Sequence, residues 1–216
     1  VTGPAGQEIH TDGYGRIKVQ FHWDREGNRN EHSSCWMRVA QAWSGSGWGF
    51  QFVPRIGMEV LVSFLGGDPD RPMVVGCVSN ATHPVPYSLP ENRTRSGIKT
   101  QSTPGGCGFN EIAFDDAKGG ELVSIRAERN MSEVVQNDHL QSVGRDQTVT
   151  VAGKRAVEVK DDDSLSVGGA QSWMVCGAST LSIGGGAAAT IAGPRSTTVA
   201  GDDTTRIGGG HTVIAA

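Results

Sequence analysis

The chain lacks the features of several common protein classes. Its 216 residues contain no apolar run approaching about 18 residues, so no membrane-spanning helix is expected. Lys and Arg number 19 and Asp and Glu 23, a net charge of −4, so the broad basic surface of a nucleic-acid-binding protein is missing. The cysteines form no C-x-x-C pair, which argues against a zinc ribbon and a disulfide framework. We expect Cys35, Cys77, Cys107 and Cys176 to be buried as small hydrophobes.

The N-terminus lacks a signal peptide pattern, and the C-terminal half has almost no aromatic residues. The N-terminus has no initiator Met, no basic start and no apolar stretch, so no signal peptide is visible and we expect a fragment of a longer protein. Nearly all Phe, Trp and Tyr residues lie between Tyr14 and Phe114, and only Trp173 follows. A conventional core is therefore expected in the first half, and something else must hold the last third together.

The last third is instead a repeat of eight residues, which divides residues 143–214 into nine octads. The first position is always β-branched, the third is usually Gly, and the seventh is mostly apolar. The residues expected to face inward are Val143, Val149, Val151, Val157, Val159, Leu165, Val167, Val175, Leu181, Ile183, Ile191, Val199, Ile207 and Val213. The repeat glycines are Gly153, Gly169, Gly177, Gly185, Gly193, Gly201 and Gly209.

The even period of the repeat predicts extended structure. In an extended chain, residues separated by an even number lie on one face. Each octad is therefore expected to be a short strand, such as 148–151, followed by a turn in which Gly permits a positive φ or a close backbone approach. The fourth and fifth positions hold turn and solvent residues such as Asp146, Lys154 and Pro194. A helix is excluded because period eight drifts around a 3.6-residue helix and the Gly content is too high.

The apolar face of the octads must be buried against something. Fully burying a Val contributes about 1.5–3 kcal/mol, and a bare face with open edges would aggregate. Either one chain coils into a solenoid, or several identical chains wind together and close their sheets around an axis. Periodicity alone does not choose between the two. A Ca²⁺-binding β-roll is disfavoured because it needs period nine and an Asp in each repeat.

The rest of the chain is predicted to be β-structure in three segments. Residues 1–80 contain five candidate strands, at 16–21, 34–40, 49–54, 59–65 and 73–79, which suits a small OB-type barrel. Residues 81–97 hold three prolines and no strand pattern, so they are interpreted as a linker. In residues 98–142, strands at 111–114 and 121–127 are expected to flank a hairpin turn at 115–120.

Several motifs strongly resemble a known family. Residues 7–24 (QEIHTDGYGRIKVQFHWD), 54–60 (PRIGMEV), 67–72 (GDPDRP), 96–99 (SGIK) and 108–112 (GFNEI) resemble signatures of the type VI secretion spike, the valine–glycine repeat protein G (VgrG) family. The octads resemble its Val-Gly tail and the tail of the contractile-phage puncturing spike. The resemblance covers essentially the whole chain.

The resemblance implies an all-β homotrimer, in which an OB-fold collar (1–80) precedes an intertwined triple-stranded β-helix needle (143–216). It implies a non-enzymatic spike that is assembled in the bacterial cytoplasm, secreted by the type VI apparatus, and driven through the target envelope with its effectors. Implied partners are the secreted tube protein through a missing N-terminal region, a PAAR-type tip protein near Ala216, effector proteins and, transiently, the target membrane. A contractile-phage baseplate spike is the alternative.

The chain departs from the family pattern in several places. Family members carry a large N-terminal tube-docking region, which would end where this chain begins. The linker is too short for the lysozyme domain of the related phage spike. Residues 159–161 (VKD) break the Gly pattern. Trp173 replaces an aliphatic residue at an inward position, and because three indoles around one axis would be crowded, we expect a local widening or register change there.

No catalytic or cofactor-binding residue is predicted. His22 and Asp24 lie on the same side of a predicted strand but lack a placed nucleophile, so we interpret them as surface residues. An envelope-degrading enzyme would need an acidic pair in a separate α-rich domain. Some OB folds bind oligonucleotides through aromatic residues. Here the acidic balance and the apolar neighbours of Trp36, Trp43 and Trp48 favour packing instead.

No metal site is predicted either. Asp161–Asp163 could supply Ca²⁺ ligands, but we interpret these residues, and the pairs Asp115–Asp116 and Asp202–Asp203, as solvated turns. In a trimer His211 would occur three times, and three imidazoles on an axis could bind a metal. The fifth octad position points outward in this register, which argues against such a site.

A substitution at an inward position tests the register. Val175→Asp would place three carboxylates near one axis, and burying unpaired charge is very costly. We expect the variant to lose resistance to heat and detergent, measured as melting temperature and as migration after unheated detergent treatment. An unchanged melting temperature would show that Val175 does not face inward.

Overall fold

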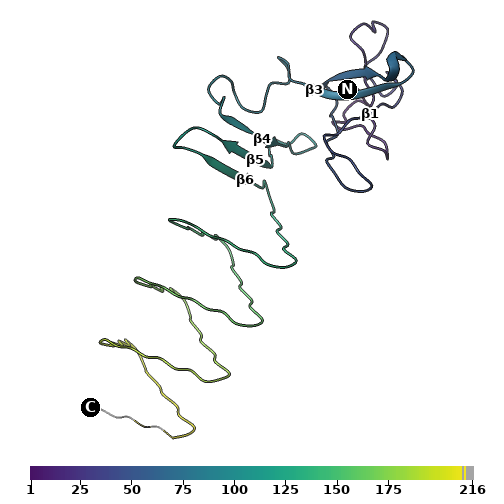
Figure 1. Cartoon of the computed structure of the whole chain (residues 1–216). Coiled ribbons are helices and arrows are strands. Elements are labelled where there is room, and N and C mark those ends of the chain that lie inside the picture. Colours follow the sequence, from purple (N-terminus) through teal and green to yellow (C-terminus); the bar gives the residue numbers. More distant parts are fainter. Residues whose placement is uncertain (211, 213–216) are drawn as a thin grey trace. The chain divides into compact units, whose positions relative to one another are not determined.

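The structure is a computed structural model that describes residues 1–210 and 212. Two residues discussed above, His211 and Val213, lie outside the described residues. The chain divides into two units, Val1–Ser142 and Val143–Ala216, and each is considered by itself (Figure 1). Within the described part of the chain, the helical structure is limited to one 3-10 turn, η1 (Leu65–Gly67). None of the helical structure described there is long and apolar enough to cross a membrane.

The first unit begins with a sheet of three strands, β1 (Arg38–Val39), β2 (Glu59–Phe64) and β3 (Pro72–Val78), in the order β1-β3-β2. β3 pairs in parallel with β1 and antiparallel with β2, where the register shifts between Leu61 and Val62. The η1 turn joins β2 to β3. Its Gly66 and Gly67 have φ angles of 66° and 77°, a left-handed conformation that glycine adopts without steric cost.

Further backbone pairings close this sheet into a small barrel. They join Met37 to Ile17, Lys18 to Thr2, and Val1 to Gly57 and Met58 at the start of β2. The ring encloses a core of Ile17, Val19, Met37 and Val74, whose side chains are 0–3% exposed. Closure removes the free strand edges, which is how a small OB-type barrel protects its backbone.

Two of the five expected barrel strands appear as β2 and β3, and the others are shorter or replaced. The segment 34–40 forms only β1, 16–21 makes two isolated bridges and 49–54 makes one, because side chains take over the partner's role. Val19 N donates to Ser34 Oγ at 3.0 Å. The Gln41 amide donates to Phe52 O and accepts from Phe52 N, both at 3.0 Å. Such local bonds compete with ladder formation.

A second antiparallel sheet completes the first unit, with β4 (Arg95–Lys99), β5 (Glu111–Asp115) and β6 (Leu122–Arg126) in chain order. The expected hairpin is confirmed, since β5 and β6 pair from Asp115–Leu122 to Glu111–Arg126. The expected linker at 81–97 is wrong at its end, because β4 begins at Arg95. β4 has Gly97 at its centre and Ile98 as its one large apolar residue, so its pattern gave no strand signal; pairing with β5 stabilises it.

The expectation of buried cysteines is wrong. Cys35, Cys77, Cys107 and Cys176 are all exposed and free. Cys77 lies in β3 but outside the core, whose β3 contribution is Val74. Cys176 falls in the octad unit, where every described residue is exposed.

The barrel core can be tested with two neighbouring residues of β3. Val74 is 0% exposed, whereas Val75 on the opposite face is 45% exposed. Val74→Ala should lower the free energy of unfolding of the barrel by about 2–3 kcal/mol through lost burial and a cavity, and Val75→Ala by less than about 0.5 kcal/mol. Urea unfolding followed by tryptophan fluorescence measures both. Equal losses would show that Val74 is not the core residue.

Candidate interaction surface

The octad unit is an open coil of extended legs joined by bends (Figure 1). The bends recur every eight residues, at 144–145, 152–153, 160–161, 168–169, 176–177, 184–185, 192–193, 200–201 and 208–209. They occupy octad positions two and three, so the turn expected around positions four and five is displaced. None of residues 143–210 lies in a hydrogen-bonded strand, because the single chain supplies no neighbour for its extended legs.

The bends do not depend on glycine. The repeat glycines have no left-handed φ, and a Cβ added to any of them would meet no atom of this chain within 4 Å. Gly144–Arg145 and Lys160–Asp161 bend in the same place with another residue at position three. The expected positive φ is therefore wrong for this chain. If the repeat glycines make room for a close backbone approach, that backbone has to belong to another chain.

The apolar octad residues face solvent in the single chain. The first-position residues are 45–55% exposed in every described octad. The apolar seventh-position residues are 65–85% exposed, because they lie farther from the bends. The first-position group is Val143, Val151, Val159, Val167, Val175, Ile183, Ile191, Val199 and Ile207; the seventh-position group is Val149, Val157, Leu165, Trp173 and Leu181. One chain does not shelter this stripe, which excludes the self-contained solenoid.

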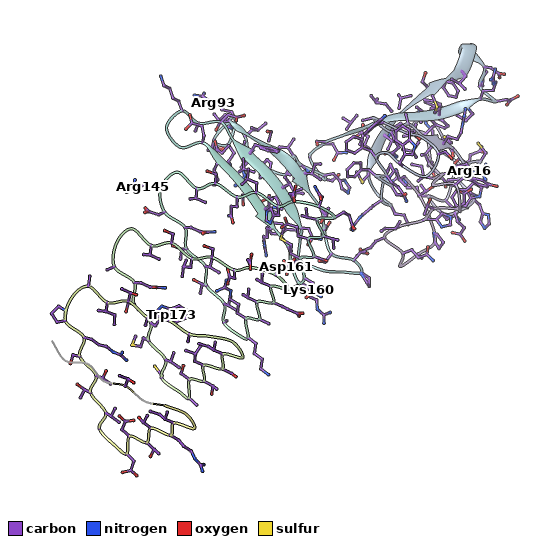
Figure 2. The ribbon with its side chains drawn as sticks, turned by 60° about the horizontal axis from the view of Figure 1, so that its bottom comes forward. Arg16, Arg93, Arg145, Lys160, Asp161 and Trp173 are labelled. Carbon is purple, nitrogen blue, oxygen red and sulfur yellow. The ribbon has the colours of Figure 1, made fainter. Side chains whose placement is uncertain are left out.

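Trp173 does not disturb the repeat of its own chain. Its indole is 79% exposed, and the bends on either side, at 168–169 and 176–177, remain eight residues apart. The single chain does not test the register change, which was expected where three indoles meet around one axis. Figure 2 shows Trp173 projecting from the coil, as do Arg145, Lys160 and Asp161 near their bends. A widening of the assembly at Trp173 stays a prediction.

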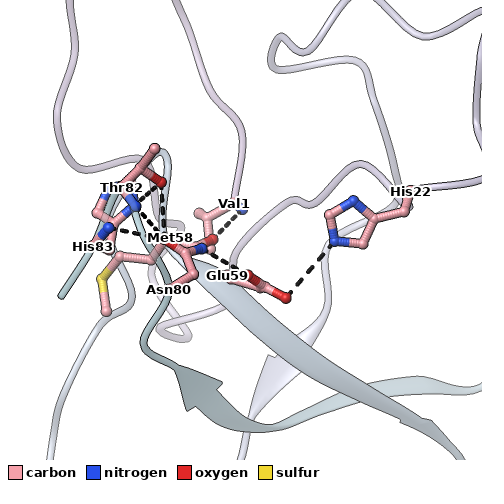
Figure 3. Close-up of polar contacts among 7 residues, drawn as sticks. All are labelled: Val1, His22, Met58, Glu59, Asn80, Thr82 and His83. Atoms are coloured by element: carbon pink, nitrogen blue, oxygen red, sulfur yellow. Dashed lines mark hydrogen bonds and ion pairs between the residues drawn. The ribbon is translucent and has the colours of Figure 1, made fainter. Parts of the chain in front are cut away.

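His22 and Asp24 are not brought together by the barrel. Asp24 Oδ1 instead accepts hydrogen bonds from Glu26 N and Gly27 N at 3.1 and 2.9 Å. The His22 side chain is 91% exposed, and its Nε2 lies 3.9 Å from Glu59 Oε1 (Figure 3). Asp24 therefore stabilises a turn, and His22 makes a contact at the surface.

Figure 3 also shows what Glu59 does at this end of the barrel. Its carboxylate accepts a hydrogen bond from Asn80 Nδ2 at 2.6 Å. Asn80 Oδ1 in turn accepts from Thr82 N and His83 N at 3.0 and 2.8 Å. The network orders the chain as it leaves β3. Among the described residues, no three His, Cys, Asp or Glu side chains gather closely enough to hold a metal ion.

The tryptophans of the barrel divide into two kinds. Trp36 is half-buried, with His10 at 4.9 Å between ring centroids and Lys18 Nζ 5.0 Å from its centroid. Trp43 and Trp48 contact each other edge to face at 5.0 Å, yet they remain 61% and 57% exposed. The expectation that apolar neighbours pack around them is therefore wrong for the single chain.

Glu8 joins the barrel to the loop that follows β4, a contact that the motif at 7–24 did not predict. Its carboxylate accepts hydrogen bonds from the Thr103 hydroxyl and from Gly105 N, the latter at 2.6 Å. These hydrogen bonds hold the pKa of Glu8 below its ordinary value, and the bond from Thr103 has the larger effect. Arg55 Nη2 donates to Gln101 O at 2.7 Å in the same loop.

Comparison with known proteins agrees with this geometry. Residues 96–211 match the family described as the bacteriophage T4 gp5 C-terminal trimerisation domain, and residues 7–78 match the type VI secretion system/phage-baseplate injector OB domain. The chain is 53% identical over 160 residues, 74% of its length, to the type VI secretion system spike protein VgrG4b of Pseudomonas aeruginosa. It is 57% identical over 153 residues, 70% of its length, to VgrG1c of the same organism.

A relative from Vibrio cholerae, the actin cross-linking toxin VgrG1, is 46% identical over 151 residues, 70% of this chain. The matched region is 20%, 21% and 14% of these three relatives, respectively. The chain therefore spans about a fifth or less of the length of the curated relatives it matches.

An OB barrel followed by a trimerisation domain defines a class of protein, the trimeric all-β spike of contractile injection machines. The chain belongs to the type VI secretion system spike family, VgrG. The resemblance inferred from the motifs is thus confirmed, together with the OB fold and intertwined β-helix. Subunits of this class are homotrimeric, which answers the question that the octad period left open.

The contact made by Glu8 predicts an acid sensitivity. Because the folded-state pKa is below the unfolded value of 4.5, the contact stabilises the loop fully above pH 4.5, and this stabilisation is lost as pH falls through the folded pKa. The protection of the 101–105 amides against hydrogen exchange, relative to the intrinsic rate at each pH, should fall in this acid window. Glu8→Gln should flatten the dependence, whereas Glu91→Gln, at an exposed site, should not. An unchanged profile in Glu8→Gln would contradict the assignment.

Proposed function

We propose that this chain is the collar and needle of a non-enzymatic, cell-puncturing spike in a type VI secretion apparatus. The observation that carries the proposal is the apolar octad stripe, which one chain leaves exposed inside a segment that matches a trimerisation domain. Residues 1–80 form the collar and 143–216 the needle. Between them lie a connecting segment, which ends where β4 begins at Arg95, and the second sheet, which ends at Arg126.

The energetics favour three chains that wind around one axis. Each first-position Val or Ile still exposes about half of its side chain. Covering that half contributes on the order of 1 kcal/mol per residue, and the contribution repeats along the whole stripe. Neighbouring chains also supply the hydrogen-bond partners that the extended legs lack, since buried backbone groups have to be paired. The product is a stiff β-shaft without free edges, which suits a mechanical role.

The remaining partners belong to the complete spike. A region N-terminal to residue 1 would bind the secreted tube protein, a PAAR-type protein would cap the needle near Ala216, and effectors would travel on the spike. The spike would be assembled in the bacterial cytoplasm, leave through the apparatus and contact the target membrane transiently. The toxin name belongs to a relative of which this chain matches 14%, so the proposal assigns no catalysis to this segment.

A baseplate spike of a contractile phage tail is the second candidate. The observation that favours it is that both matched families include phage proteins. The oligonucleotide-binding alternative has the exposed Trp43 and Trp48 in its favour, but the net charge of −4 opposes it. A steep salt dependence of binding to single-stranded DNA would support that alternative.

Two measurements test the proposal. Light scattering of the 216-residue chain should give three times its 22.7 kDa mass, and a stable monomer would contradict the spike. In a bacterium whose spike contains this segment, Ile183→Asp should abolish release of the tube protein and killing of target cells, because unpaired charge would be buried in the shaft. Ser179→Asp adds the same charge at an outward octad position and should leave both intact. Equal loss in the two variants would contradict the inward register.

A further inference from the structure

The charged residues of the octads follow a pattern of their own. Within residues 143–210, charged side chains occur eight residues apart in four pairs, and in all four pairs the two charges are opposite. They occupy octad positions four and five, which the structure places in the extended legs, since the bends occupy positions two and three. The pairs are Asp146 with Lys154, Lys154 with Asp162, Arg155 with Asp163, and Arg195 with Asp203.

None of these four pairs forms an ion pair within the single chain. All of their side chains are exposed, and the legs that carry them have no hydrogen-bonded neighbour. In the part of the octad unit that the structure describes, one ion pair forms, and it joins sequence neighbours, with Arg145 Nε 3.1 Å from Asp146 Oδ2. The opposite charges eight residues apart therefore need another chain to bring them together.

Three-fold symmetry determines which legs become neighbours. The same octad of each chain lies at the same height on a different side of the shaft, so equal octads cannot lie side by side. In a shaft with three equal sides, each bend turns the chain by a third of a circle, onto the side where the preceding octad of another chain lies. The chains run in the same direction, so equal octad positions pair in parallel, about 4.8 Å apart.

We infer that oppositely charged octad residues pair between chains, each with the residue eight positions away in the neighbouring copy, and that this pairing selects one alignment of the three chains. The inference rests on the proposed trimeric spike. The apolar stripe cannot select the alignment by itself, because every octad begins with a β-branched residue and a slip of eight residues leaves the stripe matched.

The charges, in contrast, distinguish the slipped alignments. When one chain slips by one octad, the separation between paired residues becomes zero at one neighbour and sixteen at the other. At zero, every charged residue meets its own kind. At sixteen, the opposite pair Arg145–Asp161 is offset by the like pair Asp146–Asp162. Only the separation of eight brings together opposite charges and no like charges within residues 143–210.

Repetition makes these contacts effective. One exposed ion pair contributes little to stability. Three-fold symmetry, however, repeats each of the four pairs at three interfaces, and a slip exchanges them for like charges. Coiled coils choose partner and register in the same way, through charges that flank an apolar seam. The partner that fits this surface is therefore a second copy of the same chain, displaced by one octad.

Disulfide cross-linking at neutral octad positions tests the alignment. The paired substitutions Ala156→Cys and Ser164→Cys are made in the 216-residue chain with its four native cysteines replaced by Ser. Neighbouring legs bring these two positions of different chains within the reach of a disulfide, about 4.4–6.8 Å between Cα atoms. Oxidation should link all three chains, seen as a band of three times the chain mass on a non-reducing denaturing gel. The control pair, Ala156→Cys with Ser172→Cys, lies two legs apart, about 9–10 Å, and should not link.

The mass of the same samples in solution separates this inference from the proposed function. A trimer that links both cysteine pairs equally, or that does not link residues 156 and 164, would overturn the inference and leave the spike standing. A monomer would overturn both. A disulfide that forms within one chain, without a heavier band on the gel, would also overturn the inference.

Reversal of charge tests whether the ion pairs select the alignment. Asp163→Arg with Asp203→Arg turns two of the four pairs into like charges. After unfolding in urea and refolding at low salt, the yield of the 156–164 cross-linked trimer should fall at least about twofold. Adding Arg155→Asp and Arg195→Asp restores opposite charges in exchanged order and should restore the yield.

A matched control changes the net charge equally without touching a pair. Glu158→Arg with Asp202→Arg alters residues whose positions eight away are neutral on both sides, and the yield should stay unchanged. Equal yields in all variants would overturn the role of the charges, as would an equal loss in this control.

Discussion

The structure depends on one constraint: apolar side chains recur along a chain that folds no second layer of its own over them. Between its bends the octad segment is extended, and all of its described residues are exposed. A stripe of Val and Ile in this state is stable only if other chains cover it, because its burial is the main favourable contribution to folding. Assembly is therefore part of folding in this segment, and a spike follows from it.

The barrel, in contrast, buries its apolar side chains within one chain. Its backbone pairings run in a closed ring, from the N-terminal residues through Ile17 and Met37 to β3 and β2, and Val74 lies completely buried inside. Where the ladder is interrupted, side chains such as Gln41 bond to the backbone instead. The barrel consequently has its own core. The contrast explains why aromatic residues are concentrated in the first half of the chain.

The second sheet, β4–β6, shares features with both the barrel and the octad segment. One face is covered in part by Tyr87 and the Arg95–Glu111 pair, and the other leaves Ile112 and Ile125 46% and 61% exposed.

The sequence by itself determined the repeat, its eight-residue register, the β5–β6 hairpin and the family, because periodicity and turn residues act locally. It did not reveal that the bends occur without glycine, as at Lys160–Asp161, or that Cys77 and Trp43 are exposed. Nor did it reveal which face of the second sheet is open, since Gly97 and Glu111 carry no local sign of Tyr87. The exposure of Cys77 and the open face of the second sheet were decided only by the tertiary structure, because they depend on contacts between residues that are distant in the chain.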